Sequence, residues 1–175
     1  MKTILIAAIS VNGKIEEVSG QKSLDWTSEE DRRFFVSKTK EIGTVIVGRK
    51  TFDTIGKPLK NRRLIIMSRS EAAHTHPSPD SLSPVEYSNL PPEALLKKLE
   101  DENVASVAIC GGGNIYTAFL AAGLVDEIFL TVEPYLFRGG MSLIFEGNYD
   151  STKLELLDVS KLGTQTVLLH YRVIR

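Results

Sequence analysis

The sequence contains only one cysteine, Cys110, and it has no long run of apolar residues. A single cysteine excludes an intrachain disulfide and favours a reducing compartment. No apolar stretch is long enough to span a bilayer. The start, Met1-Lys2-Thr3 followed by a short apolar run, lacks the layout of a signal peptide. We therefore expect a cytoplasmic protein without a membrane partner.

Charge of either sign is also not concentrated anywhere. The chain has 21 Lys and Arg residues against 22 Asp and Glu residues, with a formal net charge of -1. The scattered cations give no reason to expect a nucleic acid partner. A length of 175 residues with 42% hydrophobic residues predicts one domain, residues 1–175, with a real core. The pattern leaves monomer or homodimer open.

Several catalytic and metal motifs are missing. There is no G-x-S-x-G elbow and no P-loop. His74 and His76 have neither a cysteine partner nor a metal-ligand spacing, so we expect no metal. Cys110 follows an apolar run and is expected to pack in the core rather than act as a nucleophile. His170 alternates with apolar neighbours and is expected to be structural.

Apolar runs alternate with helical patterns along the chain. Strands are predicted at residues 4–11, 44–47, 63–68, 85–87, 104–110 and 127–132, and helices at 28–40, 51–55, 92–102 and 114–122. Residues 16–25 are expected to form a loop, and residues 154–160 and 164–172 to form a hairpin around Gly163. This order predicts an α/β three-layer sandwich. Its central sheet is mostly parallel with helices on both faces, and an antiparallel C-terminal hairpin lies at the edge.

One acid, Asp31, lies in the first turn of the helix predicted after Trp26. Ser28 is a suitable N-cap, and Asp31 can close a capping box back to it. Phe35 follows one turn later on the same face. A carboxylate held against apolar surface has a raised pKa and can handle protons. An acid in a first turn also complements the helix dipole without any catalytic role, and the local pattern leaves both interpretations open.

Three predicted strands end in residues suited to phosphate groups. These ends are 48–51 (GRKT), 68–69 (SR) and 111–113 (GGG). Taken singly, each end has a simpler explanation, either a tight turn or cations that are merely solvated. The full dinucleotide fingerprint is also absent. Ligands nevertheless gather at the carboxyl ends of strands in open α/β sheets, and exposed amides at helix starts favour phosphate oxygens. Together the three ends indicate a cofactor site.

Most of the chain resembles dihydrofolate reductase. The matching segments are 4–8 (ILIAA), 26–35, 47–69 (VGRKTFDTIGKPLKNRRLIIMSR), 110–116 (CGGGNIY) and 129–131 (FLT), in order and at compatible spacing. The resemblance implies an NADPH-dependent oxidoreductase of one-carbon metabolism that reduces 7,8-dihydrofolate to tetrahydrofolate. Hydride would pass to pterin C6, and Asp31 would assist protonation of N5.

The resemblance also implies a role for each matching position. The catalytic group would be Asp31 as the acid, Trp26 beside an ordered water, and Thr131 bonded to the acid. Substrate would be bound by Ile6, Ala8 and Phe35, which line the pterin pocket, and by Arg62, which grips the glutamate tail. NADPH would contact Ala8, Ile15, Gly48, Arg49, Lys50, Thr51, Ser68, Arg69, Gly111, Gly112, Gly113, Asn114 and Ile115. We expect Asp31 at the pocket floor and Arg62 at its mouth.

Other segments resemble the reductase domain of riboflavin biosynthesis instead. They are residues 10–15 (SVNGKI), 19–20, 125–127 and 138–145. They imply an alternative substrate, a ribosylaminopyrimidine phosphate or a related heterocycle. Asp31 and the run 55–62 that supplies Arg62 favour the folate substrate. A third alternative is a pterin- or nucleotide-binding protein without catalysis, against which the cost of a buried carboxylate argues.

Overall fold

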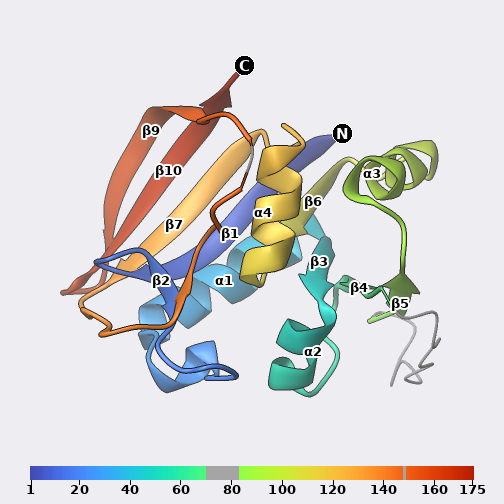
Figure 1. Cartoon of the computed structure of the whole chain (residues 1–175). Helices are drawn as coiled ribbons and strands as arrows, with labels where there is room; N and C mark the ends of the chain where they lie inside the picture. The colour runs from blue at the N-terminus through green and yellow to red at the C-terminus, as the bar shows by residue number, and fades with distance from the viewer. Residues whose placement is uncertain (70–82, 148) are drawn as a thin grey trace.

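A mostly parallel sheet forms the centre of the computed structural model, which describes residues 1–69, 83–147 and 149–175 (Figure 1). The eight strands of this sheet follow the order β5-β4-β3-β6-β1-β7-β10-β9. They are β1 (Lys2–Ser10), β3 (Thr44–Gly48), β4 (Arg63–Met67), β5 (Val85–Ser88), β6 (Ser106–Ile109), β7 (Glu127–Glu133), β9 (Lys153–Leu162) and β10 (Thr166–Ile174). The first six strands in this order, from β5 at the edge to β7, all pair in parallel. Strand β10 is antiparallel to both of its neighbours, β7 and β9. The predicted sheet and its edge hairpin are confirmed.

Helices cover both faces of the parallel part of the sheet. Helices α1 (Glu29–Ile42) and α2 (Arg49–Ile55) contribute Phe34, Phe35 and Phe52 to one apolar cluster. Helices α3 (Pro92–Asp101) and α4 (Gly113–Ala121) contribute leucines and Phe119 to the other. Alternation along the strands divides the core, since Ile4 and Ile6 of β1 belong to the cluster on the α1 side, while Leu5 and Ala7 belong to the cluster on the α3–α4 side.

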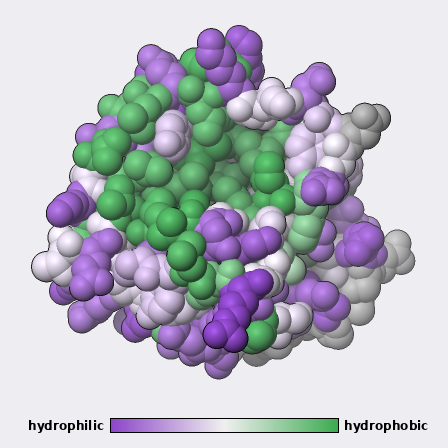
Figure 2. Space-filling model, turned by 60° about the vertical axis from the view of Figure 1, so that its left-hand side comes forward, coloured by the Kyte–Doolittle hydropathy of each residue, from purple (hydrophilic) through white to green (hydrophobic). Residues whose placement is uncertain are grey.

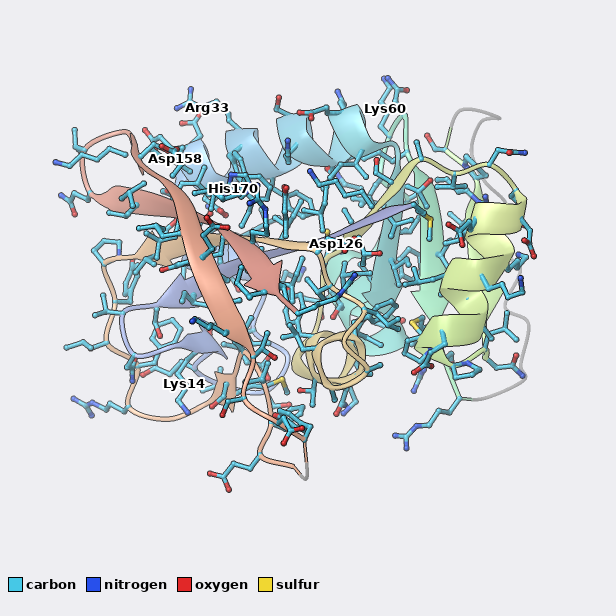
Figure 3. The ribbon with its side chains drawn as sticks, turned by 90° about the horizontal axis from the view of Figure 1, so that it is seen from above. Lys14, Arg33, Lys60, Asp126, Asp158 and His170 are labelled. Atoms are coloured by element: carbon cyan, nitrogen blue, oxygen red, sulfur yellow. The ribbon has the colours of Figure 1, made fainter. Side chains whose placement is uncertain are left out.

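The hairpin extends beyond the cover of α4. Leu154, Tyr171 and Val173 are half-buried and continue the α3–α4 side of the core onto it. Leu156 and Val159 of β9 are 52% and 54% exposed. Figure 2 shows the resulting hydrophobic area on this side of the molecule. On the opposite face His170 stacks on Phe129 at 4.0 Å between ring centroids and lies close to α1 (Figure 3), consistent with its expected structural role.

The expectation of a plain loop over residues 16–25 is wrong in part. Strand β2 (Lys14–Glu16) pairs with β8 (Met141–Ser142), and a short 3-10 helix covers Ser23–Asp25. Side chains fix this pairing, because Lys14 Nζ donates to Ser142 Oγ at 2.9 Å and Asn12 Nδ2 donates to the carbonyl of Phe137 at 2.8 Å. The partners are more than 120 residues apart, so no local pattern indicated them.

Within the described ranges, no helix combines the length and the apolar character needed to cross a membrane. His74 and His76, for which we predicted no metal, lie outside the described residues. Elsewhere in the described residues, no cluster of His, Cys, Asp and Glu side chains is arranged to hold a metal ion.

Candidate active site

Asp31 lies in the first turn of α1 with only 8% of its surface exposed. Its carboxylate accepts hydrogen bonds from the hydroxyls of Thr131, on β7, and Thr27. Burial is the main cause that raises the pKa of Asp31 above its ordinary value, and the bond from Thr131 opposes it. The nearby charge of Glu133 raises this pKa further. The arrangement produces an acid that holds its proton more strongly than an exposed aspartate.

The predicted capping box forms only by half. Ser28 is the N-cap, and its Oγ accepts from the backbone N–H of Asp31 at 3.1 Å. The reciprocal bond is absent, because the N–H of Ser28 donates to Glu133 Oε1 at 2.8 Å. Glu133 is 1% exposed and was not predicted as a site residue. Its position two residues after Thr131 on the same strand was the available signal.

Trp26 precedes α1 and is 5% exposed. Its ring makes an edge contact with Phe137 at 5.1 Å between centroids. Its Nε1 is buried and has no hydrogen-bond partner among the described residues. A buried donor of this kind is costly unless water or a ligand accepts from it, which fits the predicted contact with an ordered water.

The predicted pocket lining comes from β1 and α1. Ile6 is buried in the same apolar cluster as Phe35. Ala8 lies directly beside Thr131 in the parallel register of β1 and β7. Tyr116 of α4 closes the region from the other side of the sheet, since its hydroxyl donates to the carbonyl of Ile6 at 2.9 Å. Ile6 and Phe35 thus pack together, and Ala8 lies beside the threonine that interacts with Asp31.

Arg62 lies deeper than the mouth position that we predicted, with 5% of its surface exposed. Its Nη1 donates to Thr39 Oγ1 of α1 at 2.8 Å, and its Nε donates to the carbonyl of Lys60 at 3.1 Å. These contacts hold it against the helix that carries Asp31. Among the described residues, no carboxylate lies within ion-pair distance of Arg62. Burial lowers the pKa of its guanidinium.

The neighbouring Arg63 is in a different situation. It pairs with Glu86 at 2.7 Å and with Glu102 at 2.6 Å. The hydrogen bond that Arg63 donates to Glu86 is the main cause that raises the pKa of Arg63. Two carboxylates therefore neutralise Arg63, whereas no ion pair of Arg62 is found among the described residues.

The carboxyl ends of β3 and β6 meet the starts of α2 and α4. The N–H of Gly48 donates to the carbonyl of Gly111 at 2.7 Å. A Cβ on Gly48 would lie 3.0 Å from Ile115 Cγ1, and one on Gly112 would lie 3.2 Å from Thr51 Oγ1. These glycines therefore permit a close approach of backbone segments that a larger residue would separate.

The predicted cofactor cations lie at the same edge of the sheet and are exposed. Arg49 is 51% exposed and lies 3.7 Å from Asp53, one helical turn along. Lys50 and Arg69 are exposed as well. Asn114 is exposed at the start of α4, while Ile15 is half-buried against the core. The structure brings together three strand ends that carry long, exposed cationic side chains and closely packed glycines. This set is suited to a dinucleotide with its phosphates.

A cavity of ≈ 280 Å³ lies next to the start of α1, close to Asp31, without including that residue in its lining. Trp26, Ser28 and Glu133 line it together with Leu162 and Thr166 of the hairpin. Asp31, Ile6 and Phe35 are not among its lining residues. It is therefore distinct from the predicted substrate pocket, and it shows that the Ser28–Glu133 contact faces the hairpin.

Comparisons with known proteins agree with this fold. Residues 1–168 match the RibD C-terminal domain family. Dihydrofolate reductase type 6 of Proteus mirabilis is 28% identical over 163 residues, which cover 87% of this chain and 96% of that protein. Dihydrofolate reductase type 3 of Salmonella typhimurium is 32% identical over 133 residues, which cover 73% of this chain and 68% of that protein. The structure of a candidate riboflavin biosynthesis protein from Shewanella sp. PV-4 superposes with a TM-score of 0.85 at 19% identity, over 100% of both chains.

The fold and these relatives define a reductase of the dihydrofolate reductase-like class, a class that uses NADPH. Within it, the chain belongs to the RibD C-terminal domain family. The predicted enzyme class and the predicted resemblance to both reductase types are confirmed.

Proposed function

We propose that this protein reduces 7,8-dihydrofolate to tetrahydrofolate with NADPH. The observation that carries the proposal is a pair of buried groups on neighbouring elements. Asp31 is a buried acid whose pKa is raised by burial, and Arg62 is a buried cation whose charge no described carboxylate neutralises. Dihydrofolate offers both groups a complement, a pterin ring that needs a proton and a glutamate tail that carries carboxylates.

The strand ends fit the cofactor. Gly48, Gly111 and Gly112 would hold the backbone close to the pyrophosphate, with Thr51 beside them. Arg49, Lys50 and Arg69 would meet the remaining phosphates, with Ser68 near the adenosine ribose. When bound, NADPH supplies the hydride for pterin C6. The three exposed cations at this edge favour NADPH over NADH, because the 2′-phosphate needs such a partner.

Asp31 would orient the pterin and favour protonation of N5 through water. Thr131 would fix its carboxyl group from β7, and Ile6, Ala8 and Phe35 would exclude bulk solvent around it. Trp26 would present its unpartnered Nε1 to the water that connects the acid to the ring. General acid–base assistance of this kind accelerates a reaction by ~10²–10⁴-fold.

Arg62 would pair with the carboxylate of the glutamate tail. A guanidinium forms two parallel hydrogen bonds to a carboxylate, which lysine does not reproduce. The bond from Nη1 to Thr39 pre-orients the side chain, so little rotational freedom is lost when the tail binds.

A second candidate substrate is the ribosylaminopyrimidine phosphate of riboflavin synthesis. The family match supports it. So does the turn after β1, where Asn12 accepts from the N–H of Phe137 at 3.1 Å and ties the turn to the segment before β8. In this reaction Arg62 would meet the substrate phosphate, and Asp31 would have no pterin to orient.

One assay separates the two substrates. Purified protein is mixed with NADPH and with either dihydrofolate or the pyrimidine phosphate, and the loss of NADPH absorbance is followed. Turnover with dihydrofolate supports the proposal. Turnover with the pyrimidine alone would replace it with the second candidate. Binding of NADPH without turnover of either substrate would rule out both and leave a binding protein.

A further inference from the structure

Glu133 occupies the place that Asp31 would take in a complete capping box. In that motif the third residue of the helix accepts a hydrogen bond from the N–H of the N-cap residue. Here Glu133 Oε1 accepts from both the N–H and the Oγ of Ser28, each at 2.8 Å. With Ser28 satisfied from β7, the carboxylate of Asp31 has no N-cap donor to turn toward.

The position of Glu133 is fixed from two sides. Its other oxygen, Oε2, lies 2.9 Å from Thr166 Oγ1 on β10, and Thr166 Oγ1 also lies 3.1 Å from Ser28 Oγ. Glu133, Thr166 and Ser28 thus join β7, β10 and the start of α1. With 1% of its surface exposed, Glu133 is as buried as Thr131, which has the same value.

Thr131 and Glu133 share one face of β7, because alternate residues of a strand point to the same side. Thr131 donates to the carboxylate of Asp31, and Glu133 accepts from the residue that caps its helix. One strand therefore sets both the helix start and the direction of the acid.

We propose that Glu133 is a positioning residue for Asp31. By taking both donors of Ser28 it leaves the Asp31 carboxylate to Thr131 and Thr27, directed at the substrate pocket. This inference deepens the proposed function and rests on it for its kinetic consequence alone.

The charge of Glu133 adds a second effect. The charged and titratable groups that act on Asp31 are Glu133 from β7 and Arg32 on its own helix, and Tyr116 of α4 responds to the charge of Asp31. Glu133 raises the pKa of Asp31 and Arg32 lowers it, while burial remains the largest cause. Removing Glu133 is therefore expected to lower the Asp31 pKa for two reasons. A like charge is lost, and the N–H of Ser28 becomes free to donate to the Asp31 carboxylate.

The test compares Glu133→Gln with Glu133→Ala in the whole, ligand-free protein. The pKa of Asp31 is measured by carbon-13 NMR of the side-chain carboxyl, with the Asp31→Asn variant assigning the signal. Glutamine keeps an acceptor for Ser28 but removes the charge, so we expect the pKa to fall by at least about half a unit. Alanine also frees the Ser28 N–H, so we expect a larger fall.

Glu127→Gln is the matched control. Glu127 lies on the same face of β7 and pairs with Lys2 at 2.7 Å, remote from Ser28. Its loss should leave the Asp31 signal unchanged. If Glu133→Gln shifts the Asp31 pKa no more than Glu127→Gln does, Glu133 has no positioning role. Should the alanine variant fail to fold, the glutamine variant alone still decides.

Kinetics supply the second measurement. The rate of dihydrofolate reduction falls as Asp31 loses its proton, so Glu133→Gln should move this fall to lower pH without raising KM. A merely structural role would change stability but not the pH profile. If the NMR shift appears but neither the wild type nor any variant reduces dihydrofolate, the proposed function fails and the role of Glu133 stands. If reduction is normal and the shift is absent, the role of Glu133 fails alone.

Discussion

The guanidinium of Arg62 donates to the hydroxyl of Thr39, with 2.8 Å between Nη1 and Oγ1, and both side chains are buried. Thr39 also donates to the carbonyl of Phe35 one turn earlier in α1, at 2.6 Å. The helix that carries the acid thus also anchors the cation. This link sets the direction of Arg62 relative to Asp31 before any substrate arrives.

Replacing Arg62 with leucine should weaken binding of dihydrofolate and leave NADPH binding unchanged. Hydrogen bonds to charged groups contribute about 1.5–3 kcal/mol, so KM for dihydrofolate should rise about 10–100-fold. Steady-state kinetics with dihydrofolate and with a tail-free pterin measure the effect. The tail-free substrate should be insensitive to the change.

Arg63→Leu is the matched control for this prediction. Its side chain lies next in sequence but pairs with Glu86 and Glu102. We expect lower thermal stability, by about 1–2 kcal/mol for a partly buried ion-pair network, with KM unaltered. Equal effects of the two variants on KM would contradict a tail-binding role for Arg62.

The sequence predicted the sheet because its strands are nearly continuous apolar runs and its turns contain glycine. Ile4 to Ile9 and Val45 to Val47 are patterns of this kind, and local composition decides them. The β2–β8 pair was missed because its short strands are specified by contacts such as Lys14 with Ser142, which no local window contains. Tertiary contacts override local preference in such segments.

The candidate site was predictable to a similar extent. Asp31 drew attention as an acid in the first turn of a predicted helix, with Trp26 and Phe35 close by in the sequence, whereas Arg62 was assigned only through the resemblance to dihydrofolate reductase. Half of the capping box was wrong, because a local rule assigns the N–H of Ser28 to the nearest acid, whereas the fold brings Glu133 to it. The burial of Arg62 likewise depends on Thr39, 23 residues earlier in the chain.

Replacing Asp31 with asparagine should lower the rate of dihydrofolate reduction by ~10²–10⁴-fold at neutral pH. The loss should shrink in acid, where substrate protonated in solution can react. Rates of both proteins across a pH series measure this. An unchanged rate at neutral pH would remove Asp31 from the mechanism.

The same variant should be more stable than the wild type at neutral pH. The pKa of Asp31 is raised in the folded protein above its ordinary value of 3.8, mainly by burial. The folded state therefore binds the proton more tightly than the unfolded state, and stability from this group falls as pH rises through the folded pKa. Asparagine removes that loss. Thermal unfolding should show a gain for Asp31→Asn at neutral pH that disappears below pH 3.8.

Gly112→Ala should weaken binding of NADPH more than binding of dihydrofolate. A Cβ on Gly112 would lie 3.2 Å from Thr51 Oγ1, so it would push apart the starts of α2 and α4 by a few tenths of an ångström. We expect about a tenfold rise in the Kd for NADPH, or ~1.4 kcal/mol, measured by titration. Gly139→Ala is the control, because a Cβ there has no neighbour within 4 Å. Identical Kd values for both variants would show that Gly112 does not border the cofactor.

Cys110 should be unreactive toward thiol reagents in the folded protein. It is 9% exposed at the end of β6, and burial raises the pKa of its thiol far above the ordinary value. The thiolate is the reactive form, so almost none is present at neutral pH. We expect no labelling by an aromatic disulfide reagent under native conditions and complete labelling of this one cysteine in denaturant. Rapid native labelling would mean that this end of β6 opens to solvent. Saturating NADPH should then slow the reaction if the glycine turn that follows Cys110 borders the cofactor.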